Sequence, residues 1–468
     1  MAGEWTTFRL GDVCSKIGSG ATPRGGSSVY LEQGDMALIR SQNIYNDGFH
    51  HHGITYLTEE HAAELANVEV AEHDVLLNIT GDSIARACQV DADVLPARVN
   101  QHVAIIRPDP AVLCPRFLRY FLVSPAMQAE MLSLGGAGAT RNALTKGMIE
   151  SFEVLAPADI GEQRAIAHIL GTLDDKIELN RRLNETLEAM ARALFKSWFV
   201  DFDPVRAKCQ GRDSGLPKHI ADLFPDSFGD SELGEIPKGW GAHRLGDLLS
   251  LDKGLSYKGQ FLTELGMPMV NLGCFLGRGQ FAKHAIKNYS GEYRARHVVR
   301  PRDLVLANTD ITQKREVIGS PALVPPQGGA AEFLFSHHVY ATRFHEGAEP
   351  WKLFVHFLLL QEAFRERATG FATGTTVLAL PRDAVLELRC PAAPLQVVQA
   401  FDGAVLPAVE RQWNLSDESQ TLAALRDTLV PKLVFGELRV RPQPPGAGLG
   451  ISREETSCSQ EIDRQNTT

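Results

Sequence analysis

The sequence predicts an α+β protein with two related mixed α/β modules, each followed by a long helix. Three observations predict this fold: short β-rich runs lie between Gly, Asp and Pro residues, helical periodicity follows them, and the plan occurs twice in 468 residues. A chain of this length is expected to form two to four domains. Its 44% hydrophobic and 22% charged residues are typical of a globular protein.

An internal repeat with a period of about 235 residues relates the two halves. The segment WTTFRLGD, from Trp5 to Asp12, returns as WGAHRLGD, from Trp240 to Asp247. Further pairs follow in the same order at a nearly constant offset, so chance similarity is a poor explanation. These pairs are 74–78 with 303–308 (one residue inserted), 101–103 with 337–339, 138–140 with 374–376, and 186–187 with 421–422.

Each helical segment carries an apolar stripe at heptad spacing, which predicts a coiled coil. In the first segment Asn180 lies within the stripe and would specify its register. In the second, Pro407 and Pro431 should break or kink the helix because proline lacks an N–H donor. Two unrelated amphipathic helices on separate cores are the alternative. The expected seam consists of Ile166, Ile169, Leu173, Asn180, Leu183, Leu187, Met190, Leu194, Val398, Phe401, Val405, Leu415, Leu422 and Leu429.

These patterns divide the chain into six segments. The mixed modules are expected over residues 1–158 and 240–392, and the helical regions over 159–200 and 393–438. Turn formers such as Asp203-Pro204 and Leu216-Pro217 indicate that residues 201–239 form a surface linker. The tail, residues 439–468, has few apolar side chains and is expected to be disordered.

Composition excludes several classes of protein. Seven scattered cysteines without a CxxC pair argue against a disulfide framework or a zinc ribbon and favour a cytoplasmic protein. No apolar run is long enough to cross a membrane, and the first residues do not resemble a secretory signal. The net charge is −10, and residues 241–395 are the only basic segment, so strong nonspecific binding to polyanions is not expected.

Motifs for catalysis or metal binding by this chain are missing from the sequence. It contains no Gly-x-x-x-x-Gly-Lys-Ser/Thr phosphate loop, and no Asn-Pro-Pro-aromatic or Asp-Pro-Pro-Tyr motif for methylating an amino group. Asp174-Asp175-Lys176 is similar to half of a nuclease metal site, but it falls on a predicted helix. His50-His51-His52 is better explained as a solvated loop, because neighbouring side chains of an extended segment point to opposite faces. We expect no catalytic residues and no metal site.

Several local motifs resemble one known family over nearly the full length of the chain. Gly20-Ala-Thr-Pro23 lies in the opening segment, and a Glu-Gln-x-x-Ile-Ala…Leu…Leu-Asp string follows Pro157 and ends at Asp174. Ile177-Glu-Leu-Asn180 and Leu194-Phe-Lys-Ser-Trp-Phe199 come next. With these motifs the chain resembles the specificity subunit of a type I restriction–modification enzyme.

The second copy departs from the family pattern at two places. Pro394-Leu-Gln396 lacks the glutamate of the first copy. Ser256-Tyr257-Lys258 stands where Thr22-Pro23 would be. The resemblance is therefore stronger in the first half of the chain.

The resemblance implies a fold and a function. It implies two globular target-recognition domains, related by a pseudo-two-fold axis and held apart by two helices in an antiparallel coiled coil. Each domain would read one half of a bipartite sequence in double-stranded DNA. The implied partners are two modification (methyltransferase) subunits and restriction (motor-nuclease) subunits. S-adenosylmethionine, ATP and Mg would be bound by those partners, and this chain would bind no cofactor and catalyse no reaction.

Candidate DNA-binding residues are polar and basic side chains in Gly/Ser-rich or turn contexts. Arg and Lys can hydrogen-bond to guanine edges, and Asn and Gln to adenine edges. For each of them, a solvated loop residue or a local turn hydrogen bond is the alternative. The candidates are Lys16, Ser19, Thr22, Arg24, Arg40, Gln42, Asn43, Asn100, Gln101, Arg141 and Asn142 in the first module, and Lys253, Tyr257, Lys258, Asn271, Arg278, Lys314, Arg315, His337 and Thr376 in the second.

Two other functions stay open on the sequence alone. A coiled-coil scaffold or adaptor that clamps other proteins without reading DNA would suit the acidic balance and the lack of a basic stripe. An enzyme that fuses nuclease or methyltransferase activity to recognition is disfavoured by the missing motifs.

Overall fold

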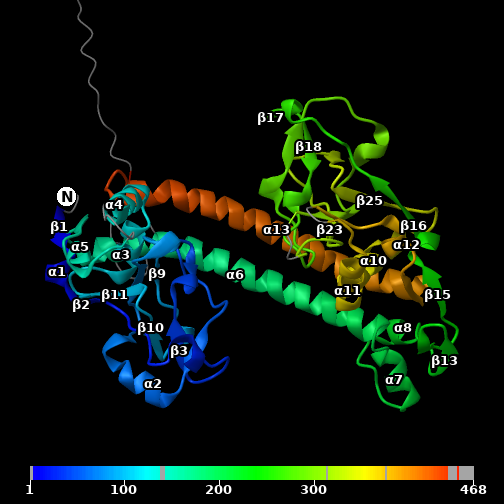
Figure 1. Ribbon diagram of the computed structural model, residues 1–468, viewed down its shortest axis with the longest axis horizontal. Coiled ribbons are helices and arrows are strands. Elements are labelled where there is room, and N and C mark those ends of the chain that lie inside the picture. Colours follow the sequence, from blue (N-terminus) through cyan, green and yellow to red (C-terminus); the bar gives the residue numbers. More distant parts are fainter. Residues whose placement is uncertain (1–3, 137–142, 312–314, 375–376, 441–450, 453–468) are drawn as a thin grey trace, which may run out of the picture. The chain divides into compact units, whose positions relative to one another are not determined.

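The computed structural model describes residues 4–136, 143–311, 315–374, 377–440 and 451–452, and it divides into two compact units (Figure 1). Unit 1 contains Met1–Leu179 and Glu418–Thr468, and unit 2 contains Asn180–Asp417. Each unit combines one mixed module with parts of two long helices, α6 (Ile160–Phe199) and α13 (Leu395–Val434). We use module 1 for residues 4–158 and module 2 for residues 240–392. The expected α+β fold with two related modules and two long helices is confirmed.

Module 1 is built on two four-stranded sheets. In the first sheet β11 (Val103–Pro108) lies between β2 and β8 and pairs antiparallel with both. In the second sheet β3 (Met36–Ile39) and β10 (Ala97–Val99) are parallel neighbours. The other strands of unit 1 are β1 (Trp5–Arg9), β2 (Cys14–Ser19), β4 (Ile44–Tyr45), β5 (Gly48–Phe49), β6 (Thr55–Leu57), β7 (Glu69–Val70), β8 (Val75–Asn78), β9 (Ala87–Gln89), β12 (Glu153–Pro157), β28 (Arg439–Val440) and β29 (Ile451–Ser452). Its short helices are α1 (Leu10–Val13), α2 (Glu59–Glu64), α3 (Pro115–Leu122), α4 (Pro125–Gly136) and α5 (Lys146–Glu150).

Module 2 repeats this plan. Strand β25 (Val339–Phe344) lies between β16 and β21, and β18 (Met267–Val270) is parallel to β24 (Phe333–Phe335). The other strands of unit 2 are β13 (Phe228–Ser231), β14 (Gly234–Pro237), β15 (Gly241–Arg244), β16 (Leu249–Lys253), β17 (Leu262–Thr263), β19 (Lys287–Tyr289), β20 (Val298–Val299), β21 (Leu304–Ala307), β22 (Thr309–Asp310), β23 (Pro321–Leu323), β26 (Leu378–Ala379) and β27 (Arg389–Ala392). Its short helices are α7 (Asp203–Cys209), α8 (Lys218–Ala221), α9 (Leu245–Leu248), α10 (Lys352–Leu359), α11 (Glu362–Phe371) and α12 (Arg382–Leu386).

Strand pairing places the two modules in register without the insertion expected between β8 and β21. Asn78 of β8 is the partner of Val103, and Ala307 of β21 is the partner of Val339. Asn78 is therefore equivalent to Ala307 and not to Asn308. The sequence comparison matched Asn78 with Asn308, which lies one position later in the repeat, and this mismatch created the apparent insertion.

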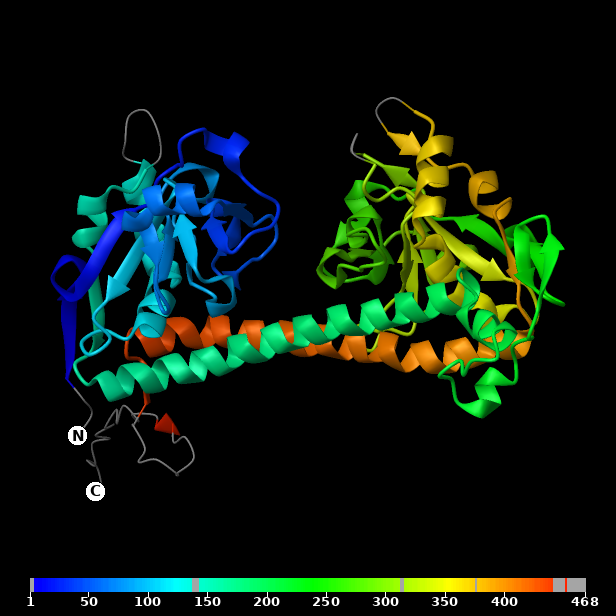
Figure 2. The same cartoon turned by 90° about the horizontal axis from the view of Figure 1, so that it is seen from below.

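The long helices pack antiparallel in unit 1, where residue numbers rise along α6 as they fall along α13 (Figure 2). Near the middle of α6, Lys176 Nζ lies 3.3 Å from Glu418 Oε2. Towards the start of α6, Ile166 shares one buried core with Val434 of α13 and Phe117 of α3. The core of module 1 is thus continuous with both helices.

In unit 2 the same two helices meet around aromatic side chains. Phe195 of α6 is fully buried and packs on Phe401 of α13, with ring centroids 5.9 Å apart. Phe354 and Phe357 of α10 lie 5.4 and 6.1 Å from the Phe195 ring. The amide of Gln412 donates to the carbonyl of Asn184 at 3.0 Å, which again requires antiparallel helices.

Two residues expected in the seam of α6 lie outside it. Leu183 and Met190 are 38% and 63% exposed, whereas Ala191 is buried. A straight helix has 3.6 residues per turn and drifts by about 20° per heptad, so the buried face moves away from strict heptad positions. The other twelve expected seam residues are buried or half-buried.

The prolines of the second helix do not break it, so that part of the expectation is wrong, and a kink at either proline stays a prediction. Helix α13 continues through Pro407 and Pro431 to Val434. Each proline removes one backbone hydrogen bond, but Val405 and Val409 on either side of Pro407 are buried in the core. Tertiary packing of an apolar face outweighs the local loss, as it does for most helices in proteins.

Residues 201–239 are a folded part of unit 2 and not the expected surface linker. They contain α7, α8 and the antiparallel hairpin of β13 and β14. Phe202, Val205, Phe224 and Ile236 from this segment are buried in the core of unit 2. The turn formers therefore separate short elements whose apolar residues cover the end of α6.

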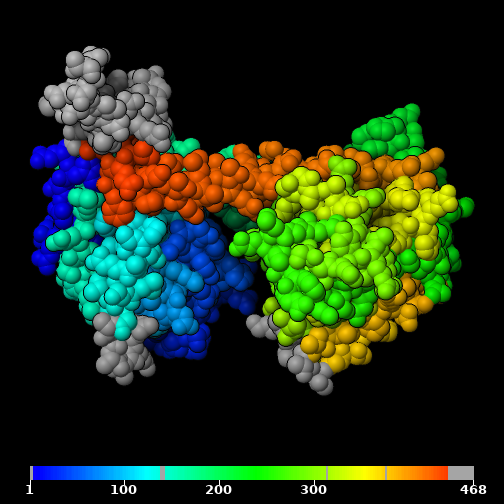
Figure 3. Space-filling model, turned by 90° about the horizontal axis from the view of Figure 1, so that it is seen from above, coloured from blue at the N-terminus to red at the C-terminus, as the bar shows by residue number. Residues whose placement is uncertain are grey.

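The expected disorder of the tail is wrong for Arg439 and Val440, and also for Ile451–Ser452, which pair with them as β29. Arg439 Nε lies 3.0 Å from Glu162 Oε1 of α6, and Val440 is 2% exposed. The start of the tail therefore packs on unit 1, where Figure 3 shows the last turns of α13 in red at the surface. Residues 441–450 and 453–468 lie outside the described part. No described helix has the length and apolar character needed to cross a lipid bilayer.

Phe195→Ala tests the aromatic contact of unit 2. We expect the free energy of unfolding of unit 2 to fall by about 3–5 kcal/mol, because the substitution leaves a cavity in the core. Urea denaturation followed by tryptophan fluorescence measures this, since Trp198, Trp240, Trp351 and Trp413 all lie in unit 2. Met190→Ala, an exposed position on the same helix, is the control and should change the value by less than about 0.5 kcal/mol. Equal effects of the two substitutions would contradict the packing described.

Candidate nucleic-acid interface

Three segments of module 1 converge at one end of its first sheet. The amide of Gly20, just after β2, donates to Val103 O at 2.9 Å, and the amide of Ile79, just after β8, donates to His102 O at 3.0 Å. The amide of Leu144 donates to Ile79 O at 2.9 Å and adds a further segment. We call residues 19–24, 79–83 and 100–102 the strand-end surface of module 1.

Module 2 repeats the same hydrogen bonds. Gly254 N donates to Val339 O at 3.2 Å, Asn308 N to His338 O at 3.0 Å, and Leu380 N to Asn308 O at 2.8 Å. The strand-end surface of module 2 therefore consists of residues 253–258, 308–311 and 336–338. Because these hydrogen bonds are the same, residues 19–24, 79–80 and 100–102 are equivalent to residues 253–258, 308–309 and 336–338.

Each surface contains one glycine at which two chain segments approach closely. A Cβ atom on Gly20 would lie 2.0 Å from Val99 O and 2.4 Å from Asn100 O. On Gly254 it would lie 2.3 Å from Ser336 O. Only glycine allows the end of the strand to approach the turn before β11 or β25 so closely.

A threonine and a histidine form a hydrogen-bonded pair on each surface. Thr80 Oγ1 lies 2.7 Å from His102 Nδ1, and Thr309 Oγ1 lies 2.9 Å from His338 Nδ1. Burial, together with the neighbouring charges of His337 and Lys253, lowers the pKa of His338 below its ordinary value. The imidazole of His338 is therefore neutral near pH 7.

In module 1 the pair belongs to a longer network. Gln101 Nε2 lies 3.0 Å from His102 Nε2, and the Thr22 hydroxyl donates to Gln101 Oε1. The surface borders an open hollow of about 440 Å³, lined by Ser41, Gln42, Tyr45, Thr80, Gly81, Asp82, Ser83, Arg86 and His102. The Arg86 guanidinium lies over the Tyr45 ring at 4.6 Å. Hydroxyl, amide, imidazole and guanidinium groups thus meet within reach of one ligand.

The structure brings about half of the described candidate DNA-binding residues to these surfaces. Thr22 lies beside Gln101, and the Tyr257 ring lies 6.1 Å from the His337 ring. The candidates on the two surfaces are Ser19, Thr22, Arg24, Asn100, Gln101, Lys253, Tyr257, Lys258 and His337. Most of them are exposed, and Tyr257 and His337 are half-buried.

Three of the candidate asparagines are buried and hold turns. The Asn43 side chain donates to His50 O at 2.9 Å, Asn100 Oδ1 accepts from the His102 amide at 3.1 Å, and Asn271 donates to Ala285 O at 2.6 Å. Their side chains are occupied by backbone groups, so we remove them from the set that can contact DNA. Asparagine serves both roles, and its sequence context does not distinguish them.

The remaining candidates lie away from the strand-end surfaces or make local contacts. Lys16 donates to Asn67 O and Glu69 O at 3.1 and 3.2 Å, and Arg40 and Gln42 both donate to Gly53 O. Arg315 donates to Thr369 O, and Arg278 is exposed next to α6 of unit 2. Arg141, Asn142, Lys314 and Thr376 lie outside the described residues.

Sequence reasoning missed the histidine of each pair. His102 and His338 are the second residues of the repeated Gln101-His-Val103 and His337-His-Val339 motifs, yet only the first residues were candidates. The shared histidine was a usable signal. Thr80 and Thr309 could be found only after the register of β8 and β21 was known.

A half-buried carboxylate ties module 1 to both long helices. Asp174 of α6 lies 2.7 Å from Arg119 of α3 and 2.7 Å from Arg426 of α13, and it accepts a hydrogen bond from the Tyr120 hydroxyl at 2.6 Å. Burial raises the pKa of Asp174, but the charge of Arg119 and the bonds from Arg426 and Tyr120 outweigh it and hold the pKa below its ordinary value. We call these four residues the Asp174 cluster.

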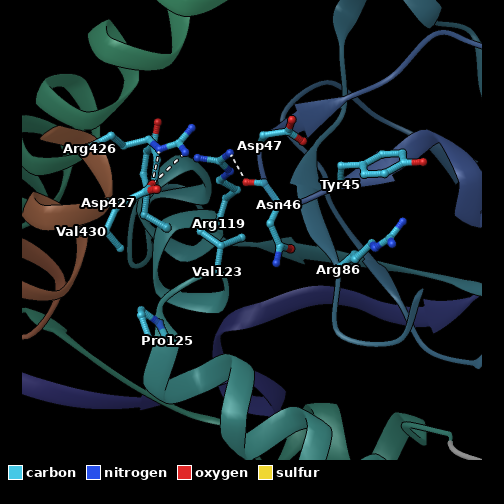
Figure 4. Close-up of a pocket in the computed structure, with 11 residues that line it drawn as sticks. Tyr45, Asn46, Asp47, Arg86, Arg119, Val123, Pro125, Arg426, Asp427 and Val430 are labelled. Atoms are coloured by element: carbon cyan, nitrogen blue, oxygen red, sulfur yellow. Dashed lines mark hydrogen bonds and ion pairs between the residues drawn. The ribbon is translucent and has the colours of Figure 1, made fainter. Parts of the chain in front are cut away.

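A pocket of about 570 Å³ opens beside the Asp174 cluster (Figure 4). Arg119 and Arg426 approach each other on one wall, where Arg119 donates to the carbonyl of Asn46 at 2.8 Å. Tyr45 and Arg86 lie across from them. The pocket therefore borders both the Asp174 cluster and the hollow of the strand-end surface.

The cluster also explains the nuclease-like motif. Asp174 binds two arginines, while Asp175 pairs with Arg116 and Lys176 with Glu418. The three side chains therefore point to different partners and do not converge on a metal. Within the described ranges, no group of three His, Cys, Asp or Glu residues could hold a metal ion.

Comparisons with known proteins give a consistent result. A family model described as the type I restriction modification DNA specificity domain matches residues 2–189. The HindI specificity subunit of Haemophilus influenzae is 22% identical, over 93% of this chain and 100% of that protein. The MjaIX specificity subunit of Methanocaldococcus jannaschii is 25% identical, over 93% of this chain and 94% of that protein. Residues 2–189 therefore match a type I restriction modification DNA specificity domain, and the chain is similar in sequence to type I specificity subunits over most of its length.

A solved structure shows the same fold. The crystal structure of the type I restriction–modification S subunit from M. genitalium matches with a TM-score of 0.58 and 15% identity. The match covers 92% of this chain and 96% of that chain, so both modules and both long helices are included.

The motif that most resembled the family has a structural role. Gln163 is fully buried; its Oε1 accepts from the Cys114 amide at 2.8 Å, and its Nε2 donates to Pro157 O at 2.8 Å. Glu162 pairs with Arg439. The Glu-Gln pair thus fixes the start of α6 against module 1 and the end of α13. Gln396, at the start of α13, is exposed, so this anchor is not repeated.

Asp174→Asn tests the Asp174 cluster. At pH 7 we expect the free energy of unfolding of unit 1 to fall by about 3–5 kcal/mol, because the substitution removes the negative charge that pairs with Arg119 and Arg426. Urea-dependent hydrogen exchange of α3 peptides measures this locally. The control is Asp175→Asn, whose carboxylate is 65% exposed and should cost less than about 1 kcal/mol.

The same variant tests the pKa of Asp174. A folded-state pKa below the unfolded-state value stabilises the protein at higher pH, and this contribution is lost as the pH falls through the folded-state pKa. The difference in stability between wild type and Asp174→Asn should therefore narrow as the pH falls below 3.8, the ordinary value for the group. A difference that widens in acid would contradict the depressed pKa.

Proposed function

We propose that this chain is the DNA sequence-recognition subunit of a type I restriction–modification complex and that it reads a bipartite target. The observation that carries this proposal is the strand-end surface, which occurs in both modules on one backbone scaffold with different side chains. Two like scaffolds can approach DNA in the same way. Unlike side chains on them suit two half-sites of different sequence.

The acidic charge of the chain agrees with a division of labour between subunits. Base readout needs few side chains, whereas most affinity comes from phosphate contacts by basic groups. With a net charge of −10, this chain would leave most of those contacts to its partners. We take these partners to be two modification (methyltransferase) subunits, joined by restriction (motor-nuclease) subunits. The partners would carry S-adenosylmethionine, ATP and Mg, and this chain would be non-catalytic.

Helix α6 offers a surface for such a partner. Leu183 and Met190 are seven residues apart, so they lie on one face of the helix, and both are exposed. Exposed apolar residues on one helix face suit contact with an apolar partner surface. A scaffold that does not read DNA would explain this face and the long helices, but not a strand-end surface repeated in both modules.

Exchanging residues 1–155 for the equivalent segment of another specificity subunit tests the independence of the two modules. The exchange replaces module 1 and keeps α6 and α13. We expect one half of the methylated motif to change and the other to stay, because each strand-end surface is built within its own module. Single-molecule methylation sequencing of DNA from the host cell gives the motif. A change in both halves would contradict independent reading.

Removing the partners tests the division of labour. We expect the isolated chain to bind its target weakly, and the assembly with two modification subunits to bind far more tightly with a steep dependence on salt. Affinity measured at several salt concentrations, with and without modification subunits, decides this. The same chain with a scrambled half-site in the DNA is the control for specificity. Equal affinity of the chain and the assembly would refute the proposal that partners supply the phosphate contacts.

A further inference from the structure

The two strand-end surfaces share a few side chains and differ in the rest. The shared residues are a glycine, a threonine and a histidine at equivalent positions. These are Gly20 and Gly254, Thr80 and Thr309, and His102 and His338. The positions that differ include Ser19 and Lys253, Arg24 and Lys258, and Gln101 and His337.

The histidines are held in the same way in both modules. Nδ1 of each ring is hydrogen-bonded to a threonine hydroxyl, at 2.7 Å for His102 and 2.9 Å for His338. The backbone carbonyl of each histidine accepts a hydrogen bond from the amide of the residue that follows β8 or β21. Thr309 is only 7% exposed, so its hydroxyl orients the ring more than it faces solvent. Two independent copies of one geometry, kept while the neighbouring side chains differ, indicate a common task.

The other ring nitrogen, Nε2, is hydrogen-bonded to no more than one exposed side chain among the described residues of either module. In the described part of the chain, His338 Nε2 has no hydrogen-bond partner, and His102 Nε2 contacts only the exposed Gln101 side chain at 3.0 Å. The His338 ring lies on the His337 ring at a centroid distance of 3.9 Å. Hence the residue before each histidine contacts it.

The chemistry of DNA suggests different contacts for the residues that the modules share and for those that differ. This step rests on the proposed function, in which the modules read different half-sites. Both half-sites present the same sugar-phosphate backbone but different base edges. Phosphate contacts position a protein on DNA, and base contacts give it specificity. Residues that are the same in both modules should meet the backbone, and residues that differ should meet the bases.

We propose that His102 and His338 are equivalent contacts to DNA phosphates, that Thr80 and Thr309 position them, and that Gln101 is a base-reading residue of its module. An imidazole Nε2–H can donate to a phosphate oxygen without selecting a sequence. For His102 this donation requires that the Gln101 amide, which now donates to His102 Nε2, turns away to pair with a base. The Gln101 amide can pair with an adenine edge in two hydrogen bonds. His337, at the equivalent position, presents a different set of donors and acceptors, as a different half-site requires.

The experiment uses the assembly of this chain with its modification subunits and a DNA library randomised in both half-sites. For His102→Ala we expect affinity to fall about ten- to a hundredfold for every sequence while the selected motif stays the same, because one hydrogen bond to a charged group is lost. His102→Gln keeps an N–H donor and should recover part of the affinity. Gln101→His, which introduces the residue of module 2, should change the selected bases in one half-site only.

The positioning role of threonine needs its own readout. Thr80→Val keeps the shape of the side chain but removes the hydroxyl, so we expect affinity to fall as it does for His102→Ala. Thr80→Ser restores the hydroxyl and should restore affinity. Thermal unfolding of each variant serves as the control for folding. A loss of affinity that serine does not rescue would contradict positioning through the hydroxyl.

Three results would overturn the inference. A changed motif in His102→Ala would make His102 a base-reading residue, unchanged affinity would mean that His102 makes no contact, and an unchanged motif in Gln101→His would remove Gln101 from base reading. Each of these requires that the wild-type assembly selects a bipartite motif. A wild-type assembly that selects none would instead refute the proposed function.

Discussion

The antiparallel packing of α6 and α13 is the constraint on which the rest of the structure depends. Each compact unit needs both helices, so unit 1 joins residues 1–179 to residues 418–468 from the other end of the chain. The apolar seam explains why: its residues are buried only when the second helix returns along the first. Gln163 and Arg439 add hydrogen bonds and an ion pair at the point where α6 begins and the chain leaves α13.

The duplicated modules attach to these helices by different interactions. In module 1 the Asp174 cluster joins α3 to both helices through charges. In the repeat, Arg119 of α3 is equivalent to His356 of α10, and Tyr120 is equivalent to Phe357. His356 is buried, and burial, followed by the charge of Arg192, lowers its pKa to about 3, so it is neutral among aromatic rings. A buried ion pair tolerates few alternative geometries, whereas an aromatic core packs more freely. The equivalent helices α3 and α10 therefore attach by charges in unit 1 and by aromatic packing in unit 2.

The sequence predicted the repeat, the two helices and their antiparallel pairing, because these depend on long periodic patterns and on a family resemblance. It failed where tertiary packing overrides a local rule. Pro407 lies within a continuous helix because the neighbouring valines are buried. Leu183 and Met190 lie outside the seam because a straight helix drifts from heptad spacing. Residues 201–239 fold because their phenylalanines are buried in the core. On the strand-end surface, polarity identified Gln101 and Thr22 but could not separate them from Asn43, which holds a turn. Thr80 and His102 meet only through the pairing of β8 with β11, which no local pattern contains.

We propose that two modules of one design read two unlike sequences in the same DNA molecule. Single-molecule methylation sequencing of host DNA, with the gene present and with it deleted, decides whether they do. We expect a single motif of two unlike half-sites around a spacer of fixed length, methylated on adenine only when the gene is present. A continuous motif, or a methylation pattern that is the same without the gene, would contradict it.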